Sequence, residues 1–377
     1  MKTKYFLLLI FCFNSIFFFS QEKIFGVVLD ENTKEPIPGV YVYYENKSIG
    51  TTSDIDGEFS LKYNSKITTP IVFSFIGYTT LKISSIEIVP NKKITIYLKE
   101  NTEVLEEVVI DHSGMKWQTK FNEFKKHYLG LTDNGKSCNI KNPQDLLLTY
   151  NPKEKKLVAK AKAPIIIENN KLKYLITVND LYFQATYRFV AKNHSSFDIQ
   201  STFYNGSAFY KDLANLTDVV TQETRLKTYQ GSILHFMRSL ARLKLTEEGF
   251  SVHILKKKII KQSDISKKII KRADISKKIT VDPIKNGVVL ISFPKPLLAI
   301  FHNKNSNSFD GSFENYSNFD DSSEDMIENY SFIESLVYYF SIDSFGNYSS
   351  KDKIIFSGLM GKTRVGDALP LDYLMEE

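Results

Sequence analysis

Between residues 24 and 98 the sequence consists of short segments in which apolar and polar residues alternate, separated by clusters of turn-forming residues. Alternation with a period of two places every second side chain on one face of a β-strand, so each segment predicts a half-buried strand. The predicted strands cover residues 24–29, 40–44, 58–63, 71–75 and 94–98. Several short strands at this spacing favour a β-sandwich. The 21 Tyr and 28 Phe residues of the chain strengthen this expectation, because aromatic side chains are enriched in strands.

The stretch DIDGE at residues 54–58 has the acids of a calcium loop, but its context predicts a turn. An EF-hand loop needs an acid at its twelfth position and flanking helices, and neither is present in the sequence. Asp54 instead suits the start of a turn, with Asp56 inside it and Gly57 supplying a positive φ. Gly39, after a proline, suits a second turn. These four residues are therefore predicted to be structural, and no metal site is expected.

The stretch GVVLDENTKEPIPGVYVYYENKSIGTTSDIDGEFSLKY, with the later FSFIGYTT, resembles the carboxypeptidase regulatory-like domain. The matching elements are Gly26-Val27-Val28 with Asp30, Pro38-Gly39-Val40, Gly50-Thr51 and residues 54–59. The resemblance covers about a fifth of the chain and implies a seven-stranded, transthyretin-like or immunoglobulin-like β-sandwich without catalytic residues. Such domains stand at the N-terminus of Gram-negative envelope proteins, including TonB-dependent outer-membrane receptors. EVLEEVVI at residues 103–110 is similar to the segment that follows the domain in those receptors, but the remaining chain is too short for a receptor's pore.

The first twenty residues predict a secretory signal peptide. Lys2 and Lys4 precede an apolar run over residues 5–19, and the small residue Ser20 precedes the first polar position. An uncleaved membrane anchor is the alternative, although the run is short for a full span. Removing the signal leaves Cys138 as the only cysteine, so no disulfide within the chain is expected, and a net charge of +4, too small to indicate nucleic acid. We expect secretion across the inner membrane, to the periplasm or the outer membrane.

The sandwich is expected to cover residues 21–100. The sequence after it predicts a linker over residues 101–135 and a larger antiparallel, β-rich domain over residues 136–377. Strands are expected at residues 146–150, 157–163, 165–167, 174–178, 182–190 and 197–203. One helix is predicted after the N-cap Ser232, with a further turn or two of helix over residues 219–227. The motifs Cys138-Asn139-Ile140, Tyr229-Gln230-Gly231-Ser232 and Leu369-Pro370-Leu371-Asp372-Tyr373 resemble a family of uncharacterised envelope proteins, which implies a compartment but no reaction.

A cationic stripe on the predicted helix is the strongest candidate site. His235, Arg238 and Arg242 fall on the side opposite its apolar face, and Arg225 precedes them. One interpretation is a site that binds an anion or a partner, and the other is an ordinary solvated face. Ser232 lies one helical turn before His235, but no nucleophile elbow or zinc-peptidase spacing occurs. The sequence thus predicts no catalytic residue, cofactor or metal.

Two segments of opposite charge interrupt the second domain. Residues 256–280 contain a basic repeat with a period of ten, and residues 310–334 carry eight acids and no Lys or Arg. They are either separate solvated loops or paired strands with facing charges, and exposed pairs of this kind stabilise a fold little. Alternatively, the basic repeat touches anionic lipid or glycolipid.

These observations together predict a non-enzymatic binding or assembly protein of the cell envelope. The expected partner is another envelope or outer-membrane protein, with anionic lipid or a glycan as alternatives and no nucleic acid. One alternative function is an accessory component of a TonB-dependent uptake system for a glycan or peptide. Another is an enzyme whose active site is dispersed over the C-terminal domain.

Overall fold

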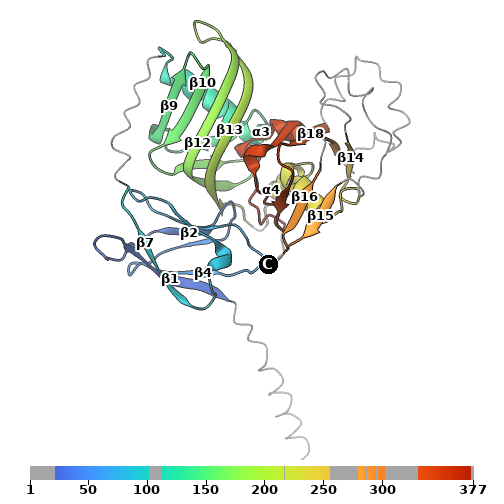
Figure 1. Cartoon of the computed structure of the whole chain (residues 1–377). Helices are drawn as coiled ribbons and strands as arrows, with labels where there is room; N and C mark the ends of the chain where they lie inside the picture. Colours follow the sequence, from blue (N-terminus) through green and yellow to red (C-terminus); the bar gives the residue numbers. More distant parts are fainter. Residues whose placement is uncertain are drawn as a thin grey trace, which may run out of the picture.

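The computed structural model describes residues 22–101, 113–215, 217–254, 279–284, 287–293, 296–301 and 330–374 (Figure 1). The predicted signal peptide, the segment 103–110, nearly all of the basic repeat and residues 310–329 of the acidic segment lie outside these ranges. The proposed pairing of the two charged segments therefore stays a prediction. No helix among the described residues combines the length and apolar character needed to cross a membrane.

The N-terminal part is a seven-stranded sandwich, as predicted. Its strands are β1 (Lys23–Asp30), β2 (Tyr41–Tyr44), β3 (Gly50–Thr52), β4 (Glu58–Lys62), β5 (Ile71–Ser74), β6 (Leu81–Ile83) and β7 (Lys93–Leu98). They form two sheets, of order β4-β1-β7 and β3-β2-β5-β6. The alternating apolar side chains of both sheets meet in one core, which includes Val28, Val42, Phe59 and Phe73.

The turn at residues 54–58 has the geometry that its sequence favours. Asp54 Oδ1 accepts hydrogen bonds from the backbone N–H groups of Asp56 (3.0 Å) and Glu58 (2.8 Å). Gly57 has a φ of +72°, and a Cβ at this position would lie 2.6 Å from the carbonyl oxygen of Val28. The turn therefore requires glycine here, both for its dihedral angle and for the close approach of β1.

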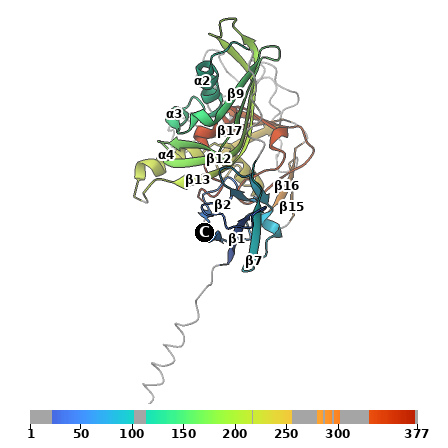
Figure 2. The same ribbon diagram turned by 90° about the vertical axis from the view of Figure 1, so that its left-hand side faces the viewer.

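A six-stranded sheet with one long hairpin follows the sandwich. Its strands are β8 (Cys138–Ile140), β9 (Leu146–Asn151), β10 (Lys156–Ala161), β11 (Ile165–Asn169), β12 (Tyr174–Val190) and β13 (Phe197–Asp212). The order is β8-β11-β12-β10-β9, and β13 pairs with β12. Helices α2 (Trp117–Tyr128) and α3 (Asp133–Lys136) lie on one side of this sheet (Figure 2).

Helix α2 corrects the predicted linker. Phe124 and Tyr128 of α2 are buried and stack edge-on against Phe183 of β12, at ring distances of 5.2 and 5.9 Å. Helix α2 thus packs on the six-stranded sheet and contributes Phe124 and Tyr128 to its hydrophobic core. The prediction of a linker is therefore wrong for residues 117–128. The physical reason is the burial of aromatic side chains, which stabilises a helix whose sequence is otherwise polar.

The C-terminal part has its own core, the third among the described residues. It contains α4 (Val219–Tyr229), α5 (Ile233–Ala241), β14 (Phe250–Ile254), β15 (Thr280–Pro283), β16 (Val289–Ser292), β17 (Leu297–Phe301), β18 (Tyr330–Ser335), β19 (Phe340–Ile342), β20 (Ile354–Gly358) and α7 (Leu359–Lys362). Its sheets have the orders β14-β17-β18-β20 and β15-β16-β19. Phe236 and Leu240 of α5 pack with Ile291 and Phe340. The mostly β class is confirmed, and the region predicted as one domain contains two cores. We call residues 113–374 the body.

Candidate functional site

The predicted cationic stripe is largely buried. Helix α5 begins after Ser232, whose hydroxyl accepts a hydrogen bond from the backbone N–H of His235 at 3.1 Å. His235 and Arg238 are only 4 % and 3 % exposed, whereas Arg242 is exposed. Both interpretations of the stripe required solvent-accessible side chains, so the expected exposure is wrong for His235 and Arg238. Residues distant in sequence bury Arg238, whereas nearby residues of the same part of the chain bury His235.

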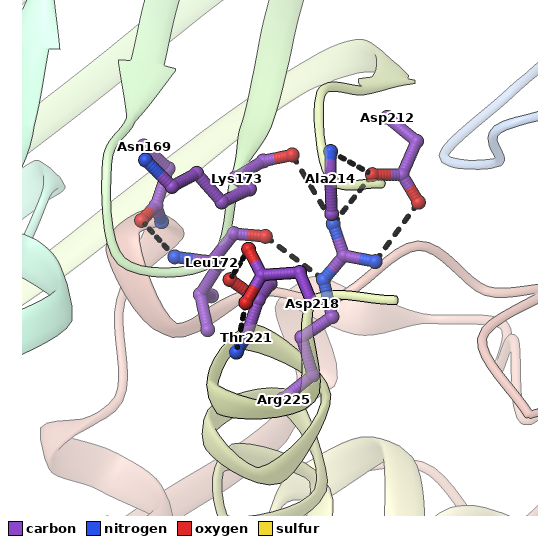
Figure 3. Close-up of polar contacts among 8 residues, drawn as sticks. All are labelled: Asn169, Leu172, Lys173, Asp212, Ala214, Asp218, Thr221 and Arg225. Atoms are coloured by element: carbon purple, nitrogen blue, oxygen red, sulfur yellow. Dashed lines mark hydrogen bonds and ion pairs between the residues drawn. The ribbon is translucent and has the colours of Figure 1, made fainter. Parts of the chain in front are cut away.

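Arg225 joins α4 to the long hairpin (Figure 3). Its Nη1 and Nη2 atoms donate to the two carboxylate oxygens of Asp212, at 2.8 and 2.7 Å. Nε donates to the carbonyl of Leu172 at 2.8 Å, and Nη2 also donates to that of Lys173 at 3.1 Å. The guanidinium lies 3.8 Å from the centre of the Tyr174 ring. A bidentate pair of this kind fixes orientation, so Arg225 sets the position of α4 against β12 and β13.

Arg238 binds three backbone carbonyls of the C-terminal part. Nε donates to Phe345 at 3.1 Å, and Nη2 and Nη1 donate to Leu371 and Tyr373, each at 2.8 Å. Burial lowers the pKa of Arg238, while hydrogen bonding and the charge of Tyr229 oppose that shift. Arg238 thereby holds residues 371–373 against α5.

His235 also has internal partners. Its Nδ1 accepts the backbone N–H of Gly231 at 3.1 Å, and its Nε2 lies 3.3 Å from a carboxylate oxygen of Glu248. Burial lowers the pKa of His235, although Glu248 opposes the shift, so the ring favours the neutral form. Ser232 uses its hydroxyl to cap the helix, which is a structural role.

Sequence reasoning missed the junction between the sandwich and the body, which is formed by the turn between β2 and β3. The N–H of Asn46 donates to the carbonyl of Ala208 at 2.7 Å, and the N–H of Tyr210 donates to that of Lys47 at 3.1 Å. Lys47 and Phe209 form a parallel bridge, so the turn extends the edge of β13. No local pattern could have revealed this pairing, since the partners lie about 160 residues apart.

Polar side chains complete the junction. Ser74 donates to Asn179 at 2.5 Å, and Asn179 donates to the hydroxyl of Tyr43 at 2.6 Å. Thr68 donates to Asp343 at 2.7 Å. These bonds join the sandwich to the body, beside apolar contacts of Phe345 with the sandwich core and of Tyr43 with Phe209.

The C-terminal segment touches both sides of the junction. The N–H of Leu371 donates to the carbonyl of Asn46 at 2.8 Å, and Asp372 accepts the N–H and the hydroxyl of Ser48. Tyr373 lies 5.8 Å from the Tyr229 ring. The motif ending in Leu371-Asp372-Tyr373, read from the sequence as a family signature, is therefore a structural connector.

Lys47 is the most unusual residue of the junction. It is fully buried, its ammonium lies 3.6 Å from the centre of the Phe345 ring, and no hydrogen-bond partner for it is found among the described residues. Burial lowers the pKa of Lys47 to about 8, although Asp343 and Asp372 raise it. The cation is thus stabilised by an aromatic face and by the field of two acids.

The chemistry available at these positions is that of binding and positioning. The polar side-chain atoms of three residues, Arg225, Arg238 and His235, form hydrogen bonds to partners within the chain. In the part of the chain that the structure describes, no three His, Cys, Asp or Glu side chains lie close enough to hold a metal ion.

Residues 24–110 match the model of the CarboxypepD_reg-like domain, so the sandwich is a carboxypeptidase regulatory-like domain, as the sequence predicted. The chain is also similar to the TonB-dependent receptor SusC of Bacteroides thetaiotaomicron, with 33% identity over 136 residues. The aligned region is 36% of this chain and only 13% of the receptor, so this chain spans a small fraction of that relative's length.

Proposed function

We propose that this protein is a non-enzymatic binding or assembly protein of the bacterial cell envelope. The observation that carries the proposal is the relationship of the N-terminal region to a TonB-dependent receptor, through a domain that has no catalytic role. The partner we propose is another envelope or outer-membrane protein, and the location is the periplasm or the outer membrane after secretion.

The geometry of the cationic residues supports a structural use of the helix rather than an active site. Arg225 and Arg238 position α4 and α5, and His235 is buried beside Glu248. An anion- or partner-binding role for these three residues and Arg242 stays a prediction, and only Arg242 has the exposure that such a role needs. An enzyme with a dispersed active site stays the least supported alternative.

The second candidate function is that of an accessory component in TonB-dependent uptake of a glycan or peptide. The named relative is itself a TonB-dependent receptor, which favours this candidate. Binding of the basic repeat to anionic lipid or glycolipid lies outside the described residues.

A capture experiment with residues 21–377 tests the proposal. The chain is cross-linked in envelope fractions, and the recovered proteins are identified by mass spectrometry. Two turn residues of the sandwich, Ile55 and Ile76, are 84 % and 67 % exposed, so Ile55→Asp and Ile76→Asp probe whether the sandwich makes the contact. Leu243→Asp on the body is the matched control, since Leu243 is 58 % exposed.

We expect stoichiometric recovery of one outer-membrane protein, reduced by the isoleucine substitutions and unchanged by the control. A monomer without a partner in every fraction would contradict the assembly role. Recovery together with the components of one uptake system would select the accessory function over a general assembly role.

A further inference from the structure

The last described residues of the chain contact all three cores. Leu369 is buried in the core of the six-stranded sheet, and Leu371 packs against the core of the sandwich. Arg238 of α5, in the third core, binds the carbonyls of residues 371 and 373. Five residues near the end of the described chain therefore contact all three cores.

The contacts at the junction are compatible with separation of the sandwich from the body. The sandwich has its own core, to which the body adds only Phe345 and, at its rim, Leu371. The other contacts are the polar bonds at Tyr43, Asn46 and Thr68 and the packing of the Tyr43 ring on Phe209 of β13, whose centroids lie 5.2 Å apart. Together they enclose the ammonium of Lys47, for which no hydrogen-bond partner is found among the described residues. Interfaces between domains of one chain permit relative motion unless they are large and hydrophobic, and here the body adds few apolar side chains to the sandwich core.

We propose that residues 371–373 are a latch that keeps the sandwich docked on the body. With the latch in place, the turn between β2 and β3 covers the edge of β13 at residues 208–210. Release of the latch uncovers this edge, whose backbone groups then accept an extended polypeptide segment, as they accept Asn46 and Lys47 in the closed form. The inference does not depend on the proposed function, because it concerns contacts within the chain.

Hydrogen exchange of the full chain separates a latch from a passive tail. In Asp372→Asn the carboxylate that accepts from Ser48 is lost, so the amides of Ser48 and Leu371 exchange faster whatever the role of the tail. The N–H groups of Asn46 and Tyr210 donate to β13 and to Lys47 and are not bonded to the tail, although the carbonyl of Asn46 accepts from Leu371, so Tyr210 is the reporter without a direct bond to the tail. We expect these two also to exchange about 10- to 100-fold faster, the factor typical of losing hydrogen bonds to a charged group.

Asp198→Asn is the control, because it removes an exposed ion pair with Arg188 at the far end of β13. It should leave the Asn46 and Tyr210 amides unchanged. The amide of Val28, bonded within the sandwich to Gly57, reports whether the sandwich stays folded. If Asn46 and Tyr210 keep their wild-type exchange in Asp372→Asn, residues 371–373 are not a latch.

The uncovered edge is probed with a labelled peptide of residues 43–50, the segment that covers it in the closed form. The acceptor is the full chain with Asp372→Asn and Leu371→Asp, since a carboxylate facing the sandwich core opens the junction further. We expect the peptide to bind this variant at least tenfold more tightly than the wild type. Equal binding to both chains, or no binding to a variant whose Tyr210 amide exchanges freely, overturns the assignment of the edge.

Discussion

Replacement of Lys47 by methionine should stabilise the protein. The ammonium is fully buried and unpaired, and its surroundings contain two acids, Asp343 and Asp372, and two further cations, Arg238 and Lys351. Methionine keeps an unbranched stem against the neighbouring aromatic ring and removes the charge. Replacing a buried charge by an apolar group of similar volume is often stabilising.

The magnitude follows from the pKa of Lys47, which burial lowers from 10.5 to about 8. At 1.36 kcal/mol per pKa unit, the charged lysine costs the folded state about 3 kcal/mol at neutral pH, which is an upper bound on the gain in Lys47→Met. Between pH 8 and 10.5 the unfolded chain binds more protons than the folded one at this position, so the cost falls as pH rises. The free energy of unfolding of the wild type should therefore rise relative to that of the variant between pH 8 and 10.5.

Chemical denaturation at about pH 7 and about pH 9 measures the effect, as the difference between wild type and variant. Lys47→Arg is the control, because arginine stays charged and its cost does not fall over this range. We expect Lys47→Met to raise the midpoint at pH 7 and its advantage to shrink at pH 9. A lower midpoint at pH 7, or an advantage independent of pH, would refute the reasoning that the ammonium is a net cost.

Three further predictions concern single positions. Arg225→Met should lower the free energy of unfolding by about 1–3 kcal/mol in urea denaturation, because it leaves two carbonyls without their donor and removes the ion pair of Asp212, which keeps its bond from the Ala214 N–H; an unchanged midpoint would contradict its positioning role. Gly57→Ala should cost about 1–3 kcal/mol by calorimetry and more than Gly77→Ala, where φ is also positive (+86°) but a Cβ meets nothing within 4 Å; equal costs would show that crowding is unimportant. Burial raises the pKa of Glu123, but a hydrogen bond from His127 and the charge of Lys126 outweigh burial and lower that pKa, so its stabilisation is present above the ordinary pKa of 4.5 and lost as pH falls; Glu123→Gln should flatten the acid limb of thermal stability, and an unchanged limb would refute this.

The sandwich could be predicted from sequence because its determinants are local. Alternation fixes which side chains face the core, and the turn at Asp54 and Gly57 depends on residues within four positions. Helix α2 could in principle also have been predicted from the sequence. Its apolar residues Trp117, Phe121 and Phe124 recur at spacings of four and three, but they stand in a polar sequence that reads as a linker.

The candidate site could not be predicted, because its partners are distant and are mostly backbone atoms. Arg238 binds carbonyls that lie 107 to 135 residues further along the chain, and no side-chain pattern marks a carbonyl as an acceptor. The helical period predicted one polar face for His235 and Arg238, but the ring of His235 packs on Phe250 of the core and near Tyr229. The period could not show that the C-terminal segment covers Arg238.

The opposing contributions of Lys47 and Asp372 make the docked state sensitive to small changes, and their coupling can be measured. Asp372 stabilises the buried charge of Lys47 in addition to accepting hydrogen bonds from Ser48. Asp372→Asn should therefore destabilise the wild type more than it destabilises Lys47→Met, where no ammonium remains to lose its counter-charge. A double-mutant cycle on unfolding free energies should give a coupling of about 0.5–3 kcal/mol, as for groups that interact directly. If Asp372→Asn costs the same in both backgrounds, Asp372 acts only through its hydrogen bonds, and the cost of the buried lysine is independent of the tail.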